Sequence, residues 1–112
     1  MQKNYLGEFE ELVLLTVAVL SGEAYGALIT QDISARTRRS VQISAVHVAL
    51  YRLEEKGFLN SHMGGSTQER GGRRKRFFTL TPAGAHALQE IQAIRSKLWQ
   101  GIPQGVIQLF GI

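Results

Sequence analysis

The sequence predicts a mainly α (α+β) fold in a single domain of 112 residues, with three helices, a β-hairpin and a last helix in that order. Apolar residues recur at helical spacing in three successive stretches of the first half. Two short stretches of alternating residues then predict paired strands. A Thr-Pro pair at residues 81–82 predicts the start of the last helix. This order is typical of a winged helix-turn-helix.

The first predicted helix covers residues 8–20 and is apolar around most of its circumference. Three glutamates near its start suit the positive end of the helix dipole. A helix that is apolar on nearly every side is buried on more than one side. In so small a chain we expect the second covering to be another subunit, which would contact Leu12, Leu15 and Val19.

The second and third predicted helices cover residues 25–37 and 44–56 and form the helix-turn-helix. Ser44 is the candidate N-cap of the third helix, and Gly57 lies just past its end. One side of the third helix carries apolar residues that face the core. The opposite side carries the residues that we expect to contact DNA bases and phosphates: Ser44, His47, Val48, Tyr51 and Arg52. Two alternatives stay open: Tyr51 packs on the hairpin, and Arg52 pairs with Glu54 or Glu55.

The hairpin joins predicted strands at residues 58–63 and 76–80 through a long, glycine-rich tip. Five cations fall within seven residues of that tip, and no acid lies among them. Clustered arginines suit phosphate contacts and the narrow minor groove of A·T-rich DNA. The expected DNA contacts of the tip are Arg70, Arg73, Arg74, Lys75 and Arg76. The alternative is a solvated loop whose charge only confers solubility.

The last predicted helix, residues 82–100, has an apolar stripe wider than its own domain needs. We expect a second subunit to pack on Leu88, Ile91, Ile94, Leu98 and Trp99. Trp99, the only tryptophan, is then an interface anchor, with a wall for a small aromatic effector as the alternative. The uncharged, apolar tail at residues 101–112 is expected to dock on its own domain or on a partner subunit.

Composition narrows the function classes. Lysine and arginine number 13 against 9 acids, a net charge of +4 that favours an anionic partner. Cysteine is absent and the three histidines match no metal-ligand spacing, so we expect no metal and no cofactor. No nucleophile elbow or phosphate loop is present, and we expect no catalytic residues and no enzyme. The longest apolar stretch is too short to cross a membrane, so we expect a cytoplasmic protein.

Four stretches of the sequence resemble the PadR family of winged-helix transcriptional regulators. They are EFEELVLL at 8–15, AYG at 24–26, LYRLEEKGFL at 50–59 and RGGRRKRFFTLTPAG at 70–84. The family often has Gly-Thr-Leu-Tyr-Pro or Gly-Ala-Val-Tyr in its recognition helix, whereas this chain has SAVHV at 44–48. His47 therefore stands where the family has tyrosine. The chain also ends soon after the last helix, as in the short branch of the family.

The resemblance implies a homodimeric repressor that binds double-stranded DNA at a palindromic operator. It also implies release from DNA by a small aromatic effector. The expected organisation is a winged-helix DNA-binding domain at 1–81, a C-terminal dimerisation helix of the same domain at 82–100, and the apolar tail at 101–112. Two rival interpretations remain: a winged helix that binds an acidic protein partner, and one that binds RNA through the basic hairpin.

Overall fold

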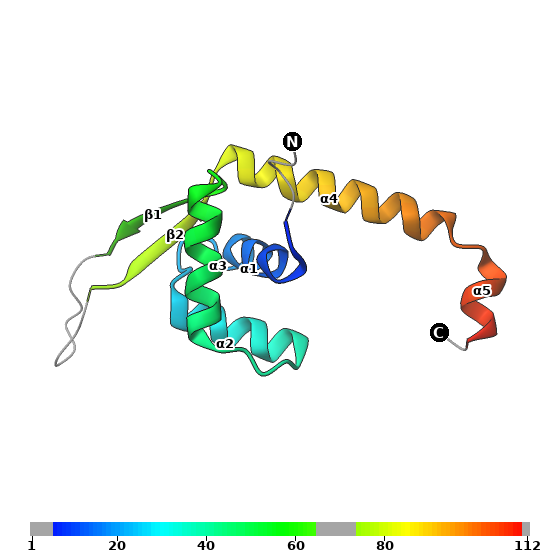
Figure 1. Ribbon diagram of the computed structural model, residues 1–112, viewed down its shortest axis with the longest axis horizontal. Coiled ribbons are helices and arrows are strands. Elements are labelled where there is room, and N and C mark those ends of the chain that lie inside the picture. Colours follow the sequence, from blue (N-terminus) through cyan, green and yellow to red (C-terminus); the bar gives the residue numbers. More distant parts are fainter. Residues whose placement is uncertain (1–5, 65–73, 111–112) are drawn as a thin grey trace.

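The computed structural model describes residues 6–64 and 74–110 and confirms the winged helix-turn-helix. Three helices form the body, the wing projects from one end, and a long helix extends from the other (Figure 1). The elements are α1 (Glu8–Val19), α2 (Gly26–Thr37), α3 (Ile43–Glu55), β1 (Leu59–Met63), β2 (Arg76–Leu80), α4 (Pro82–Gly101) and α5 (Gln104–Leu109). The hairpin formed by β1 and β2 is called the wing below.

The core lies where α1 meets the other two helices of the body and the wing. Val13, Leu14 and Val17 of α1 are fully or almost fully buried, as expected for a helix that is apolar on most sides. From α3, Val46, Leu50 and Leu53 are shielded from solvent by the same cluster. The apolar stripes predicted from helical spacing thus face inward.

The acidic first turn of α1 connects three other parts of the chain. Glu8 accepts a hydrogen bond of 2.8 Å from Arg39 in the α2–α3 connection, and Glu10 accepts one of 2.7 Å from Lys56 at the end of α3. Glu11 pairs with Arg95 of α4. The glutamates therefore form ion pairs between elements, in addition to lying at the positive end of the helix dipole.

The connection between α2 and α3 covers residues 38–42. Arg38 is the C-cap of α2 and adopts a left-handed conformation, with φ of 59°. The helix α3 then begins at Ile43, with Gln42 as its N-cap and no side-chain capping bond. The prediction of Ser44 as the N-cap is wrong, because Ser44 lies inside the first turn of α3. Gly57 has φ of 84°, which suits a residue just past a helix end.

The two strands of the wing are antiparallel, and a segment before α2 extends their sheet. Leu59 pairs with Leu80, and Ser61 pairs with Phe78. Tyr25 forms an isolated bridge to Phe77, and the Phe78 N–H donates to the Ala24 carbonyl at 2.8 Å. The root of the wing is therefore hydrogen-bonded to the chain that leads into α2.

The start of α4 confirms the predicted Thr-Pro cap. The Thr81 hydroxyl accepts the Gly84 N–H at 3.0 Å and donates to the Gly57 carbonyl at 2.7 Å. The Thr81 N–H also donates to the Phe58 carbonyl at 3.1 Å. A Cβ on Gly84 would overlap the Phe58 carbonyl oxygen, so the first turn of α4 needs glycine at this position.

The first half of α4 supplies its apolar contacts with the body. Ala87 is buried, and Leu88 and Ile91 lie against the core of the same chain. From Ile94 onward the helix projects away, and α5 follows after a break at Pro103 (Figure 1). Residues 94–109 are called the arm below. The tail that was expected to dock thus forms α5, which lies away from its own winged-helix body.

Candidate nucleic-acid interface

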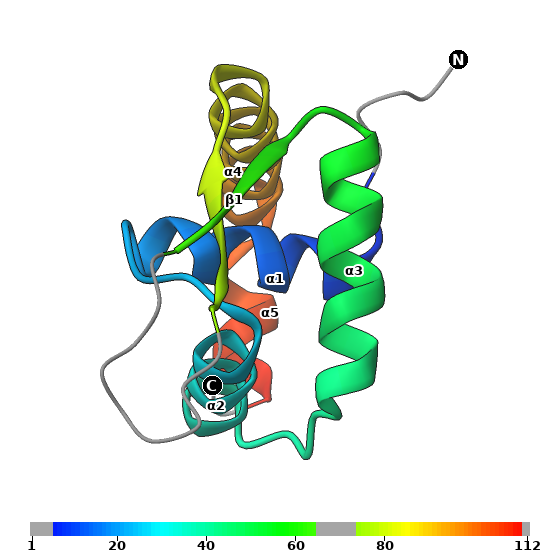
Figure 2. The ribbon, with the colours of Figure 1, turned by 90° about the vertical axis from the view of Figure 1, so that its left-hand side faces the viewer.

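The candidate recognition face is the outward side of α3. Val48 is 52% exposed and Tyr51 is 48% exposed, although both are large apolar or aromatic side chains. Ser44 and Arg52 are also exposed, and His47 is half-buried at the edge of this side. Figure 2, which views the molecule from the wing end, shows α3 and the wing side by side. The structure therefore presents all five residues predicted on this helix at or beside one surface.

His47 packs against the start of α2. A Cβ added to Gly26 would lie 2.7 Å from His47 Nε2, closer than real Cβ contacts allow. The His47 ring also lies 6.2 Å from the ring of Tyr51, one turn further along α3. Gly26 therefore permits the close approach of the two helices of the helix-turn-helix at this point.

Tyr51 connects the recognition face to the wing. Its ring meets Phe78 of β2 edge to face, with centroids 6.3 Å apart, and Phe78 is buried. The alternative that Tyr51 packs on the wing is thus correct for one edge of its ring, while about half of the side chain stays exposed.

Arg52 lies on the side of α3 that faces the start of α1. No ion pair joins it to Glu54 or Glu55 within residues 6–64 and 74–110, so that alternative finds no support. Arg52 borders a shallow depression of about 460 Å³ between α1 and α3. The depression is lined by Gly7, Glu8, Phe9, Glu10, Ala45, Val48, Ala49, Arg52 and Lys56.

The wing carries cations on the other side of α3. Arg74 donates to the Gly64 carbonyl at 2.9 Å, and Arg76 donates to the Ser61 hydroxyl at 2.9 Å. The Lys75 ammonium lies 4.4 Å from the centre of the Tyr25 ring, whose edge meets Phe77. Arg70 and Arg73, predicted DNA contacts of the tip, lie outside the described residues.

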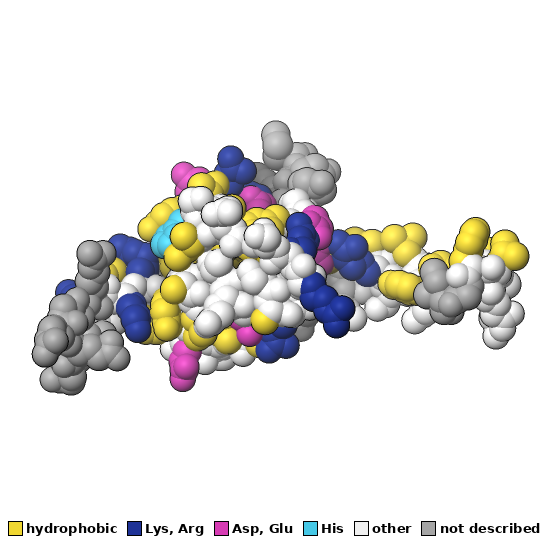
Figure 3. Space-filling model, turned by 90° about the horizontal axis from the view of Figure 1, so that it is seen from below, with side chains coloured by type: hydrophobic (Ala, Val, Ile, Leu, Met, Phe, Trp, Pro, Cys, Tyr) yellow, Lys and Arg dark blue, Asp and Glu magenta, His cyan; other side chains and the backbone are white. Residues whose placement is uncertain are grey.

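Three arginines outside the wing have carboxylate partners that the described wing cations lack. Arg36, Arg39 and Arg95 each pair with a carboxylate. None of the three wing cations that the structure describes forms such a pair. In Figure 3, lysine and arginine side chains border the wing, while hydrophobic side chains lie along the outstretched arm. Uncompensated positive charge is therefore concentrated beside the recognition face.

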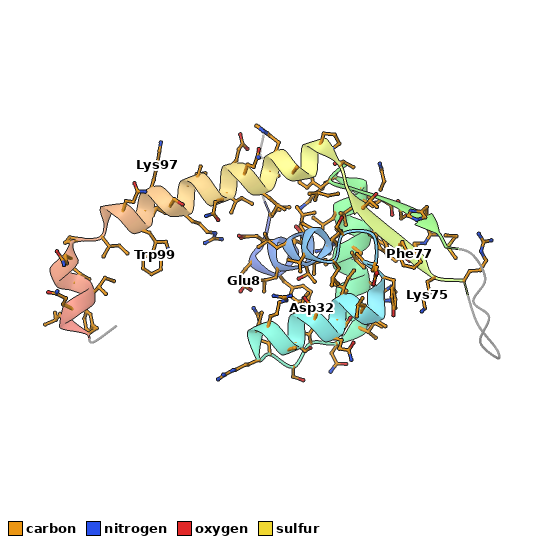
Figure 4. All side chains as sticks on the ribbon, turned by 180° about the vertical axis from the view of Figure 1, so that it is seen from behind. Glu8, Asp32, Lys75, Phe77, Lys97 and Trp99 are labelled. Carbon is orange, nitrogen blue, oxygen red and sulfur yellow. The ribbon has the colours of Figure 1, made fainter. Side chains whose placement is uncertain are left out.

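The predicted dimer contacts fall into two groups. Leu12, Leu88 and Ile91 are partly buried within their own chain. Leu15 and Val19 of α1 are exposed, as are Ile94, Leu98 and Trp99 of the arm. Trp99 is 65% exposed and points toward the side of α4 on which α1 and α2 lie, opposite Lys97 (Figure 4). Large apolar side chains with this exposure are typical of surfaces that pack on a partner.

No group of three or more histidine, aspartate or glutamate side chains could hold a metal ion in the described part of the chain. Among those same residues, no helix has the length and apolar character needed to cross a bilayer.

Comparison with known proteins places the chain in a family. Residues 14–90 match the model of the transcriptional regulator PadR-like family. An uncharacterized protein of Lysinibacillus sphaericus is 30% identical over 106 residues, which is 93% of this chain and 88% of that protein.

Solved structures agree in fold. A PadR-like transcription factor from Bacteroides fragilis has a TM-score of 0.67 and 26% identity, over 82% of this chain and 84% of that one. Bacillus subtilis PadR, solved in complex with operator DNA, has a TM-score of 0.61 and 20% identity, over 87% of this chain and 49% of that one. On the family match over residues 14–90, the chain belongs to the PadR-like family of transcriptional regulators.

Proposed function

We propose that this protein is a cytoplasmic, sequence-specific DNA-binding regulator that acts as a homodimeric repressor. The observation that carries the proposal is the exposed face of α3 next to a wing whose described cations lack carboxylate partners. In a helix-turn-helix protein the second helix of the motif enters the major groove. Family membership supports the same role, and the B. subtilis relative was solved with operator DNA bound.

The recognition face and the wing have different roles in this proposal. Ser44, His47, Val48, Tyr51 and Arg52 contact the major groove or its edges. An arginine side chain such as that of Arg52 can form two hydrogen bonds to a guanine, which discriminates this base from others. A valine side chain such as that of Val48 can contact a thymine methyl group. Arg70, Arg73, Arg74, Lys75 and Arg76 of the wing hold phosphates or the minor groove and contribute mainly affinity.

The arm supplies the proposed dimer contact. Ile94, Leu98 and Trp99 are left exposed where α4 leaves the body. A second copy that packs on them, and on Leu15 and Val19, would give the complex two recognition helices. A two-fold arrangement would place these in successive major grooves about 34–36 Å apart, on a palindromic operator. A small aromatic effector held at Trp99 between the subunits is the proposed means of release.

Fluorescence anisotropy tests DNA binding. The protein is titrated onto the duplex upstream of its own gene and onto a scrambled duplex of equal length, at low and near-physiological salt. We expect salt-sensitive binding with a preference of about 10³-fold or more for the native duplex. No binding at either salt would favour the protein-interaction alternative, and competition by tRNA as strong as by the native duplex would favour RNA.

The wing is tested with a variant that replaces Arg73, Arg74 and Arg76 with alanine. We expect weaker binding to both duplexes and a flatter dependence on salt, because phosphate contacts release counterions. Lys97→Ala, which removes one cation from the arm, is the matched control and should bind as the wild type does. Unchanged affinity of the triple variant for both duplexes would contradict the role of the wing.

A further inference from the structure

A hydrogen-bonded chain joins the recognition helix to both strands of the wing. Arg76 Nη1 of β2 donates to the Ser61 hydroxyl of β1 at 2.9 Å. The same hydroxyl donates to Glu54 Oε2 of α3 at 2.7 Å. Because a serine hydroxyl has one hydrogen, its donation to Glu54 leaves its lone pairs to accept from Arg76. The chain Arg76–Ser61–Glu54 is therefore directional.

The chain lies on the face of the wing that packs on α3. Ser61 is paired with Phe78, and Phe78 meets the Tyr51 ring of α3. Tyr51 and Glu54 are three residues apart on α3, so they lie on neighbouring turns of one helix side. An aromatic contact and a polar chain thus connect the same two elements side by side.

Arg76 retains most of its donors for another partner. The guanidinium has five N–H groups, and Ser61 accepts from Nη1 alone. The side chain of Arg76 is exposed, and Arg76 comes directly after Arg74 and Lys75 in the sequence. The chain to Glu54 thus orients a cation at the point where the wing adjoins the recognition face.

We propose that Ser61 and Glu54 are positioning residues for operator binding. They hold the Arg76 guanidinium, and with it the tip-side end of β2, in a fixed place relative to α3. This inference rests on the proposed function. A fixed guanidinium favours the specific complex, in which α3 and the wing must contact DNA together. A loose one still neutralises a phosphate in non-specific complexes.

The first test is Ser61→Ala, which removes the bridging hydroxyl and leaves every charge in place. We expect affinity for the native duplex to fall about 3- to 10-fold, as for loss of one hydrogen bond. Affinity for the scrambled duplex and the salt slope should not change. Ser61→Thr keeps the hydroxyl and should restore binding. Asn60→Ala is the matched control, because this exposed neighbour lies on the opposite face of β1.

Glu54→Gln separates positioning from simple charge. If Glu54 only repels DNA, its neutralisation should tighten binding to both duplexes. Glu54→Gln keeps an oxygen that accepts from Ser61, so a positioning role predicts an unchanged preference for the native duplex in this variant. Glu54→Ala removes the acceptor as well and should bind the native duplex more weakly than Glu54→Gln does, with equal binding of the two variants to the scrambled duplex. Arg76→Ala removes the cation itself, so it should weaken binding to both duplexes and lower the salt slope by about 0.9, the value for one phosphate contact.

The outcomes separate this inference from the proposed function. A wild-type protein that binds neither duplex would contradict DNA binding. Amide hydrogen exchange in β1 and β2 then still tests the hydrogen-bonded link from Arg76 through Ser61 to Glu54. We expect exchange to be about 3- to 10-fold faster in Ser61→Ala than in Asn60→Ala. Wild-type binding that Ser61→Ala leaves unchanged would overturn the inference. So would an equal loss on both duplexes or unchanged exchange in the wing.

Discussion

Arg95 of α4 and Glu11 of α1 form a two-point ion pair at the place where α4 leaves the body. Arg95 Nη2 lies 2.6 Å from Glu11 Oε1, and Arg95 Nε lies 3.2 Å from Oε2. Such a fork fixes direction as well as distance. The hydrogen bond to Glu11, reinforced by the carboxylate charge, raises the pKa of Arg95 above its ordinary value. The pair thus sets the direction in which the arm departs.

Arg95→Ala should lower the melting temperature slightly, and by the same amount at about pH 7 and about pH 10. A pKa raised in the folded state contributes stability that is complete below the pKa of the unfolded arginine. That stability is lost only as the pH rises through the still higher folded value. Both conditions lie below that window. Thermal denaturation beside Lys97→Ala checks this, and a difference that shrinks at the higher pH would contradict it.

Gly26→Ala should destabilise the helix-turn-helix by about 1 kcal/mol, the lower end of the usual cost of overpacking, because the half-buried His47 ring can move partly aside. The added Cβ would lie 2.7 Å from His47 Nε2. Alanine is otherwise preferred over glycine in a helix, so the sign of the effect identifies the clash as its cause. Urea denaturation of Gly26→Ala, His47→Ala and the double variant forms a thermodynamic cycle. The double variant should recover most of the loss, and simple additivity would contradict the assigned contact.

Gly84→Ala should destabilise the protein by more, about 3 kcal/mol, because its Cβ would meet the Phe58 carbonyl oxygen. A backbone carbonyl cannot rotate aside as a side chain can. Gly105→Ala in α5 is the matched control, since nothing lies within 4 Å of the added Cβ. That control should be neutral or slightly stabilising. Equal urea midpoints for the two variants would show that α4 can shift away from Phe58.

Trp99 reports directly on self-association. It is the only tryptophan and is 65% exposed in one chain. Its emission should move to shorter wavelength as protein concentration rises and the dimer buries it. Trp99→Ala should weaken the dimer by about 2 kcal/mol or more, the scale of an interface hot spot. Light scattering coupled to gel filtration measures this, with Lys97→Ala, on the opposite side of α4, as the control.

Half of the wild-type protein is dimeric at its midpoint concentration. If Trp99→Ala is equally dimeric at that concentration, Trp99 does not lie in the interface. Emission that does not depend on concentration, in a protein that scattering shows to be dimeric, would place the interface elsewhere, such as on Leu15 and Val19.

The local signals of the sequence predicted the element order well, because each depends on only a few neighbouring residues. Helical spacing identified the buried sides of α1 and α3. Thr81 and Pro82 marked the start of α4, where the capping bond to Gly84 is present. The prediction of Ser44 as the N-cap was wrong, because α3 begins two residues earlier than a cap at Ser44 would allow, with Gln42 in the N-cap position.

Contacts between distant elements could not be predicted in the same way. The glutamates of α1 suited the helix dipole, and nothing in their spacing indicated that they would pair with Arg39, Lys56 and Arg95. The link from Glu54 through Ser61 to Arg76 depends on how the wing turns onto α3, which periodicity does not encode. The sequence shows glycine at positions 26 and 84 but does not show why glycine is needed there. The reason is the proximity of the His47 ring and of the Phe58 carbonyl, which only the packed structure reveals.

The contacts around Phe58 couple the orientation of α4 to the orientation of the recognition helix α3. Its first turn is held at the Phe58 carbonyl, directly beyond the end of the recognition helix. Ile91 and the Arg95–Glu11 pair hold α4 on the body, so body and helix turn together. A helix of 20 residues is about 30 Å long, so a rotation of about 10° moves its far end by about 5 Å. In the proposed dimer the C-terminal ends of the two α4 helices meet. A displacement of these ends would therefore also rotate the body of each subunit. A shift of a few ångströms between the two arms would rotate both α3 helices and change their fit to consecutive grooves.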